Sequence, residues 1–175
     1  MRQRSSNSRQ GGVTSAKPPP GDPVETGLRL LSRRDHSREE LRRKLSRRGH
    51  EKQAIEEAME RIHRSYRLDD QAFARSYVRR RSSAKGPMAI AVELAARGID
   101  RASAEAALAE FGAAEQLQAA TLLAFRLYSR QREDLDYRQV VDRIGAKLLR
   151  RGFSTSIARA ACRSVIAGAA RPPDD

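Results

Sequence analysis

The sequence, 175 residues long, is poor in the residues that disulfide-bonded, membrane-spanning and aromatic-rich proteins need. Its one cysteine, Cys162, can form no disulfide within the chain, which favours the reducing cytoplasm. There is no tryptophan and there are only four phenylalanines and four tyrosines, so stacking on aromatic rings is not expected to dominate recognition. No stretch approaches the ~20 apolar residues of a membrane span, and the N-terminus lacks the apolar core of a signal peptide. We therefore expect a cytoplasmic protein without a membrane partner.

Groups of side chains that catalyse reactions or bind metals are missing too. The three histidines, His36, His50 and His63, have neither a cysteine partner nor the i,i+4 spacing of a helical metal pair. Cys162 falls at one of the apolar repeat positions described below, so we expect it in a core rather than as a nucleophile. The sequence contains no phosphate-binding glycine loop and no dinucleotide fingerprint. It thus predicts a protein that is not an enzyme and holds no cofactor or metal.

What the chain has in excess is positive charge. Its formal charge is +13, from 35 lysines and arginines against 22 aspartates and glutamates, and most of the basic residues are arginines. Such a surface favours polyanions, which include DNA, RNA and protein–nucleic-acid assemblies. The alternative is a set of solvated helix faces on which basic and acidic residues are interspersed.

The two ends of the chain differ from its centre. Residues 1–23 are rich in Ser, Arg, Gln, Gly and Pro and include a run of three prolines, so they cannot bury enough apolar surface to fold. We expect a disordered basic tail over 1–23 and a loose tail over 169–175.

Between these ends one pattern recurs three times. Gly49, Gly98 and Gly152 each follow an arginine, and each has a leucine four residues earlier. Apolar residues lie eight and four positions before each glycine and six, ten and thirteen after it, which is the spacing of one helix face. These residues are Leu41, Leu45, Ile55, Met59 and Ile62, then Ile90, Leu94, Ala104, Leu108 and Phe111, then Ile144, Leu148, Ala158, Cys162 and Val165. A fixed period of this kind predicts a repeat protein whose function lies in an extended surface.

Each repeat is predicted to be a helix, a tight Arg-Gly turn and a second helix, with a further helix before this pair. Ser37-Arg38-Glu39-Glu40 and Asp136-Tyr137-Arg138-Gln139 are capping-box patterns that start the first and third of the helices leading into a turn. The further helices are expected at roughly 24–34, 69–82 and 113–131, and nothing predicts a strand. We expect an all-α fold of three tandem three-helix repeats, at 24–66, 67–112 and 113–168, stacked into an elongated, curved molecule.

The paired helices also resemble the helix–turn–helix of DNA-reading proteins, whose second helix presents Arg, Gln or Asn to base edges. The corresponding helix of the second repeat, from Arg101 to Leu108, is mostly alanine, and that of the third has only Arg159 and Arg163 as base-reading residues. A hairpin that stabilises a repeat explains the pattern better than sequence-specific readout.

Clusters of basic residues remain as candidates for binding a partner. They fall in all three predicted repeats, which suits a long polyanionic surface better than a single pocket. Arginine adds bidentate contacts to phosphate and carboxylate groups. The candidates for contact with a protein partner or with DNA are Arg42, Arg43, Arg47, Arg79, Arg80, Arg81, Lys85, Lys147, Arg150 and Arg151.

In its repeats the chain resembles the RecX family of regulatory proteins. The second repeat matches through Leu68-Asp69-Asp70, Phe73-Ala74, Tyr77-Val78, Arg81, Gly86, Glu93-Leu94 and Arg97-Gly98-Ile99. The first repeat matches through Leu30-Leu31, Arg34, His36-Ser37, Glu40-Leu41, Lys44-Leu45 and Gly49, and the third through Arg150-Arg151-Gly152-Phe153. The resemblance covers residues 24–168 and leaves out the tail.

This resemblance implies a cytoplasmic protein, not an enzyme, that binds RecA. Members of the family are thought to lie in the helical groove of the RecA–DNA filament, where they restrain recombinase and ATPase activity and so modulate recombination and DNA repair. The alternative is a general nucleic-acid-binding helical protein or transcriptional regulator that is independent of RecA. The sequence has no long heptad seam, so we expect a monomer.

Overall fold

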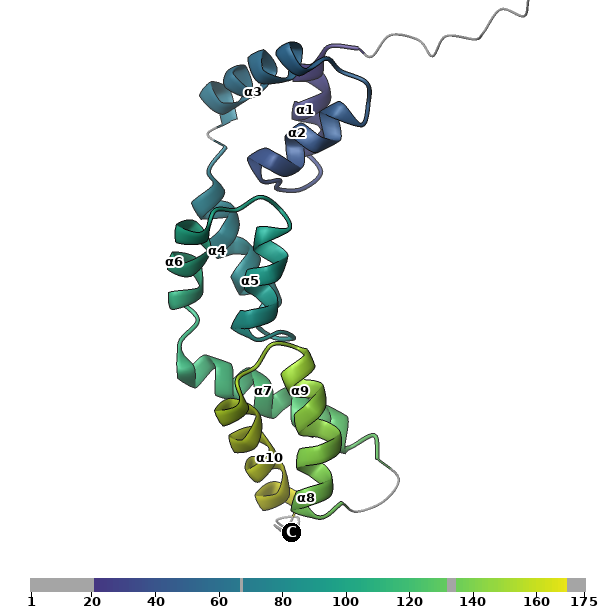
Figure 1. Ribbon diagram of the computed structural model, residues 1–175, viewed down its shortest axis with the longest axis vertical. Helices are drawn as coiled ribbons and strands as arrows, with labels where there is room; N and C mark the ends of the chain where they lie inside the picture. The colour runs from purple at the N-terminus through teal and green to yellow at the C-terminus, as the bar shows by residue number, and fades with distance from the viewer. Residues whose placement is uncertain (1–20, 67, 132–134, 170–175) are drawn as a thin grey trace, which may run out of the picture.

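The computed structural model describes residues 21–66, 68–131 and 135–169, and within them all regular structure is helical. Most of the predicted tails, residues 1–20 and 170–175, lies outside this part of the chain. The helices form three groups stacked along the long axis of the molecule in a gentle arc (Figure 1). This arrangement is the elongated, curved, all-α stack that the sequence predicts.

Each group contains a first, a middle and a last helix. The first group is α1 (Pro23–Leu31), α2 (Arg38–Ser46) and α3 (Lys52–Tyr66); the second is α4 (Asp70–Arg81), α5 (Pro87–Ala95) and α6 (Arg101–Ala109). The third is α7 (Ala113–Tyr128), a middle helix made of α8 (Tyr137–Val140), the π-helical η1 (Val141–Gly145) and α9 (Ala146–Arg150), and α10 (Thr155–Ala169). We propose 24–66, 67–112 and 113–168 as the limits of these units.

Side-chain caps fix where several helices begin. The carboxylate of Asp22 accepts a hydrogen bond from the Val24 amide, so α1 begins at Pro23 instead of 24. Asp136 and Gln139 form the capping box predicted at the start of α8. The box predicted at Ser37 is only half present. Ser37 accepts from the Glu40 amide, but the Glu40 carboxylate pairs with Arg34, 2.5 Å away, because the preceding loop brings that guanidinium within reach.

Each group has its own hydrophobic core, built largely from the repeated apolar positions. The residues eight and four before each glycine are completely buried: Leu41, Leu45, Ile90, Leu94, Ile144 and Leu148. Leu108 departs from the pattern, since it is only partly buried while its neighbour Ala107 is buried. Leu68, just past the proposed first unit, packs into the first core. The apolar faces of the helices in each group therefore enclose a small core of their own, and the three cores follow one another along the molecule.

Glycine ends each middle helix. Gly49, Gly98 and Gly152 have φ values of 89°, 76° and 85°, a left-handed conformation that residues with a side chain adopt only with strain. The turn reverses the chain so that the last helix of each group packs beside the middle one. The predicted Arg-Gly helix stops are thus confirmed in all three units.

A candidate partner-binding surface

The second and third units meet through backbone hydrogen bonds. At the start of α5 the amide of Gly86 donates to the carbonyl of Arg151 over 2.8 Å, and the amide of Met88 donates to the carbonyl of Gly152 over 3.2 Å. A β-carbon added to Gly152 would overlap the backbone of Ala89. Donors at the beginning of α5 therefore bind carbonyls at the end of α9.

The first and second units meet at the corresponding positions, with a side-chain hydroxyl as the donor in place of a backbone amide. The hydroxyl of Ser37, at the start of α2, donates to the carbonyl of Arg97 over 2.5 Å. A β-carbon added to Gly98 would overlap the side chain of Glu39, in the first turn of α2. At both junctions the acceptor belongs to the arginine just before the turn glycine, and the donor belongs to the residue that caps the next middle helix.

These junctions align the three middle helices. From the C-terminal unit upward, α8–η1–α9, α5 and α2 follow one another in one direction, each helix end meeting the beginning of the next. We call this stack of helices the column. It runs along the inner side of the arc, with α3, α6 and α10 on the outer side (Figure 1). The column is the longest continuous feature on which a partner could lie.

Two of the predicted contact residues are held by an acidic group beside the column. The carboxylate of Glu93, on α5, accepts from Arg81 at 3.0 Å, from Tyr77 at 2.7 Å and from Lys85. The guanidinium of Arg97 lies over the Tyr77 ring, 4.4 Å from its centroid. The hydrogen bond from Arg81 is the largest cause that lowers the pKa of Glu93 to about 2. Arg81 and Lys85 are thus already paired within the protein.

Four other predicted contact residues also form hydrogen bonds or ion pairs within the protein. Arg42 forms a bidentate pair with Glu56, with its Nε 2.9 Å from a carboxylate oxygen. Arg43 donates to the carbonyl of Ala96 and lies 3.5 Å from Glu39. Arg80 donates to Ser76 and reaches Asp35 at 3.9 Å, and Arg151 donates to the carbonyl of Ala84 at 3.4 Å. These contacts connect neighbouring helices or units and do not leave the guanidinium groups fully available.

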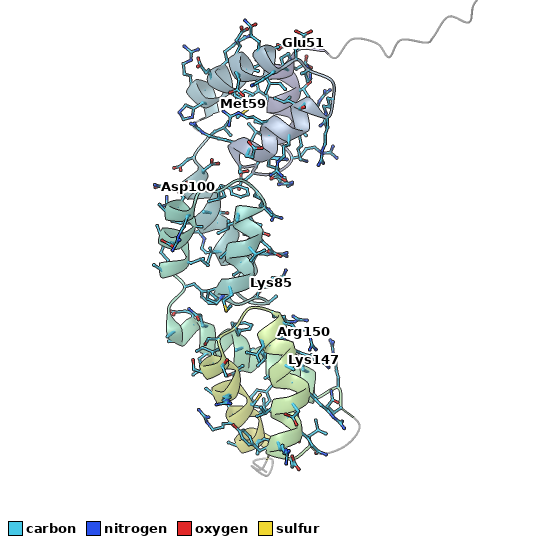
Figure 2. All side chains as sticks on the ribbon, viewed as in Figure 1. Glu51, Met59, Lys85, Asp100, Lys147 and Arg150 are labelled. Atoms are coloured by element: carbon cyan, nitrogen blue, oxygen red, sulfur yellow. The ribbon has the colours of Figure 1, made fainter. Side chains whose placement is uncertain are left out.

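The remaining four form no ion pair with a carboxylate of the described residues: Arg47, Arg79, Lys147 and Arg150. Arg47 lies at the end of α2, and Lys147 and Arg150 lie on α9, so three of the four belong to the column. Figure 2 shows Lys85, Arg150 and Lys147 following one another along the inner side, across the junction of the second and third units. Lys85 of the second unit and Arg150 and Lys147 of the third thus lie in one line beside the junction.

A second group of basic residues lies away from the column. Arg75, Arg79 and Arg126, together with Glu110 and Glu115, line a hollow of about 420 Å³ between α4, α6 and α7, whose lining includes Val78 and Phe111. The i,i+4 spacing of Arg75 and Arg79 predicts that both lie on one helix face. Arg126 comes from the next unit, and no local pattern predicts that it lies beside them.

Metal binding and membrane insertion find no support in the described part of the chain. Among its His, Cys, Asp and Glu side chains there is no group of three that could hold a metal ion. None of the described helices is long and apolar enough to cross a membrane.

Comparison with known proteins places this architecture in a family. Residues 25–61 match the first three-helix domain of RecX, and residues 69–108 match the second three-helix domain of RecX. The regulatory protein RecX of Xanthomonas axonopodis pv. citri (strain 306) is 39% identical over 142 residues, which cover 81% of this chain and 86% of that protein. The regulatory protein RecX of Geobacillus thermodenitrificans (strain NG80-2) is 33% identical over 135 residues, covering 76% of this chain and 50% of that protein.

Solved structures agree with the sequence comparison. The crystal structure of RecX from Lactobacillus salivarius superposes with a TM-score of 0.71 and 28% identity, over 83% of this chain and 95% of that one. A second crystal structure of regulatory protein RecX gives a TM-score of 0.69 and 27% identity, over 77% of this chain and 68% of that one. The repeat pattern, the three-unit stack and these relatives lead to one conclusion. This chain belongs to the RecX family of regulatory proteins.

Proposed function

We propose that this protein binds RecA and the groove of the RecA–DNA filament, and that it restrains recombinase and ATPase activity during recombination and DNA repair. The observation that carries the proposal is the column: a long, curved inner side, with basic residues on α2 and α9, in a member of the RecX family. A filament groove is itself long and curved and contains phosphates, so an extended surface of this kind suits it better than a compact one would. In this proposal the protein acts in the cytoplasm as a monomer, without catalysing a reaction.

We assign the leading contacts to the four candidates whose side chains form neither an ion pair nor a hydrogen bond among the described residues, namely Arg47, Arg79, Lys147 and Arg150. An arginine already bound to a carboxylate must give up that contact before it binds a phosphate, so its net gain is smaller. The other candidates are proposed as secondary contacts: Arg42, Arg43, Arg80, Arg81 and Lys85, which pair with carboxylates, and Arg151, which donates to the carbonyl of Ala84. DNA is reached through the same basic surface.

A second candidate function is general binding of nucleic acid without RecA. The charge of +13 favours it, because counterion release alone gives affinity for any polyanion. The last helix of the second unit does not add base readout: α6 carries Arg101 as its only basic residue, and this guanidinium pairs with Glu105 at 2.6 Å. The two functions therefore differ in whether RecA contributes to affinity.

Binding to RecA-coated single-stranded DNA and to the same naked strand, each measured across a salt series, tests the proposal. We expect tighter binding to the filament with a shallower dependence on salt, since protein–protein contacts add to phosphate contacts. Equal affinities that both fall steeply with salt would establish the general nucleic-acid binder instead. The DNA-dependent ATPase and strand exchange of RecA, measured at saturating protein, should both decrease, and unchanged rates would contradict the proposal.

A further inference from the structure

The two most exposed large apolar side chains of the described residues lie one turn apart on α5. Met88 is 67% exposed and Val92 is 69% exposed, and their i,i+4 spacing places both on one face of the helix. Ala95 and Ala96, which are exposed too, continue this face at the end of the helix. Glu93 is the only charged residue of α5, so the helix is apolar toward solvent as well as toward its core. We call Met88, Val92, Ala95 and Ala96 the α5 stripe.

The corresponding positions of α2 are charged. Ten, six and two residues before its turn glycine, α2 carries Glu39, Arg43 and Arg47, whereas α5 carries apolar residues of its stripe at the same three positions. The fold requires apolar residues only at the buried positions, eight and four before the glycine, which both helices have. Packing within the second unit therefore does not explain the stripe, and an exposed apolar surface of this kind is typical of a binding site.

Basic side chains border the stripe at both of its ends. Toward α2, the guanidinium of Arg43 reaches across the junction and donates to a carbonyl at the end of the stripe over 2.8 Å. Toward α9 lie Lys147 and Arg150, which form no ion pair among the described residues. The nearby carboxylates of Glu39 and Glu93 are already paired with basic residues of the protein. The surface is thus an apolar centre between two positive ends.

We infer that the α5 stripe is the part of the column that binds protein, and that it packs against an apolar patch of a RecA subunit bordered by acidic side chains. The inference rests on the proposed function and assigns the centre of its surface to one component of the filament. α5 is the central helix of the column, on the inner side of the arc (Figure 1). Leu149, 45% exposed in the last turn of α9, adds apolar surface at the neighbouring junction.

DNA does not suit the stripe itself. Phosphate groups are bound by hydrogen-bond donors and positive charge, and the exposed side chains of the stripe supply neither. Bases of a single strand stack on aromatic rings or guanidinium planes, and the stripe contains only aliphatic and thioether side chains. An apolar patch of a protein gains from burial against such a surface, and acidic residues at its border are complementary to the basic ends.

A second copy of this chain suits the stripe less well, because its own apolar surfaces lie among basic residues. Each copy has a formal charge of +13, and a contact between two stripes would bring the basic ends of two columns together. Leu122 and Tyr137 expose apolar surface elsewhere, but each lines a hollow that has more arginines than carboxylates. Residues 1–20 and 170–175 contain a single branched aliphatic side chain, Val13, and so offer little apolar surface to cover the stripe.

The test makes the stripe polar without changing its charge. Met88→Gln and Val92→Gln are combined in the full chain, and the fold should persist because both side chains are mostly exposed and glutamine is a good helix former. Leu122→Gln is the matched control, since this leucine is 52% exposed on α7, which is not part of the column. Val92→Thr is a milder second variant, which exchanges one methyl group for a hydroxyl and keeps the shape of the side chain.

Affinity is measured for RecA-coated single-stranded DNA and for the same naked strand, together with the unfolding midpoint and the sedimentation of each protein. We expect the double variant to bind the filament about tenfold more weakly, the loss of a central apolar contact, and to bind the naked strand as the wild type does because its charge is unaltered. Val92→Thr should weaken filament binding by a smaller factor, and Leu122→Gln should leave it unchanged.

Wild-type filament affinity in a folded double variant overturns the inference, and if that variant unfolds, wild-type affinity in Val92→Thr overturns it instead. Equal losses for the filament and the naked strand also overturn it, because the stripe would then contact DNA. The same holds if the wild type self-associates and the double variant does not, since the occupant would then be a second copy. A wild type that binds the filament no more tightly than the naked strand refutes the proposed function, and the inference with it, before any variant is compared.

Discussion

The Glu93 carboxylate shows how one acidic residue organises basic residues from two helices. It accepts hydrogen bonds from Arg81, Tyr77 and Lys85, while Arg97 covers the face of the Tyr77 ring. The group connects the end of α4 to the last turn of α5. In a protein of such high positive charge, a carboxylate shared by several cations lowers the repulsion between them, so its protonation should weaken the second unit.

Stability should therefore fall in acid in a way that depends on Glu93. Its pKa is about 2 in the folded protein, against an ordinary value of 4.5, so the stabilisation is fully present above pH 4.5. As the pH falls from 4.5 toward 2, the unfolded chain takes up the proton first and the stabilisation is lost. We expect wild type to unfold at a higher temperature than Glu93→Gln at neutral pH, and the difference to shrink across this window. A difference that stays constant down to pH 2 would show that the carboxylate charge contributes nothing.

At this scale the sequence predicts residue types better than it predicts partners. It places the buried leucines correctly because each is fixed by its spacing from a glycine in the same hairpin. It does not predict that Arg81 and Lys85 share Glu93, because side chains twelve and eight residues away along the chain meet only once α4 and α5 have packed. The sequence therefore does not distinguish among the basic clusters, whereas the structure separates members that pair with a carboxylate from members that do not.

At the scale of elements, the three Arg-Gly turns have one conformation but different surroundings. Gly152 is packed against the start of α5 and Gly98 is packed against α2, whereas a β-carbon added to Gly49 would meet none of the described atoms within 4 Å. A single substitution at each turn thus separates the cost of the left-handed backbone from the cost of breaking a junction.

Alanine at these turns should destabilise the protein by unequal amounts. Gly49→Ala is expected to cost about 1–2 kcal/mol, which is the strain of a left-handed residue with a β-carbon. Gly152→Ala should cost clearly more, since the added carbon overlaps the backbone of Ala89 and forces the second and third units apart. Urea unfolding of both variants gives the comparison. Equal losses would mean that the junction contributes no stability.

The helix boundaries show which local sequence signals are sufficient to predict where a helix begins. Gly86-Pro87 begins α5 and Asp69 caps α4 as expected, because proline and aspartate act on their own first turn. The middle helix of the third unit was expected, but its π-helical segment over Val141–Gly145 was not. There the carbonyl of Val140 lies 3.9 Å from the thiol of Cys162, a contact made by α10. A helix distortion that involves a later element cannot be predicted from the helix's own residues.

At the scale of the whole molecule, the unpaired basic residues and the paired ones should differ in function. Replacing Lys147 and Arg150 together by glutamate removes two positive charges from the column without breaking an ion pair among the described residues. We expect filament binding to weaken and its salt dependence to become shallower, with little change in helical content. Replacing Arg81 by glutamate instead breaks the Glu93 group and should lower the unfolding temperature more than it lowers binding.

The two variants are compared by circular dichroism and by binding at several salt concentrations. If the Lys147 and Arg150 replacement leaves filament binding unaltered, the column is not the contact surface and the hollow beside Arg79 becomes the next candidate. If it unfolds the third unit, these side chains support the fold.

The overall arrangement could be predicted only in part. A period of about fifty residues and three similar hairpins predict a stack of three units. The order of the helices along the column could not be predicted. One junction uses a backbone amide and a carbonyl, groups that nearly every residue carries. At the other junction the donor is the Ser37 hydroxyl, which the sequence predicts only as a cap of its own helix.

The alignment of the middle helices has one more consequence. Because α8–η1–α9, α5 and α2 all point the same way, the molecule has a direction. The column begins at α8, whose first turn is capped by Asp136, and it ends at the turn of Gly49, where an added β-carbon would meet none of the described atoms. The proposed binding place is a filament groove, and a filament that repeats one subunit in one direction has a direction of its own. A molecule with a direction can lie in such a groove in two inequivalent orientations, so its two ends would meet different neighbours. In the proposed complex, the orientation of the bound protein would decide which end of the filament the Gly49 turn faces.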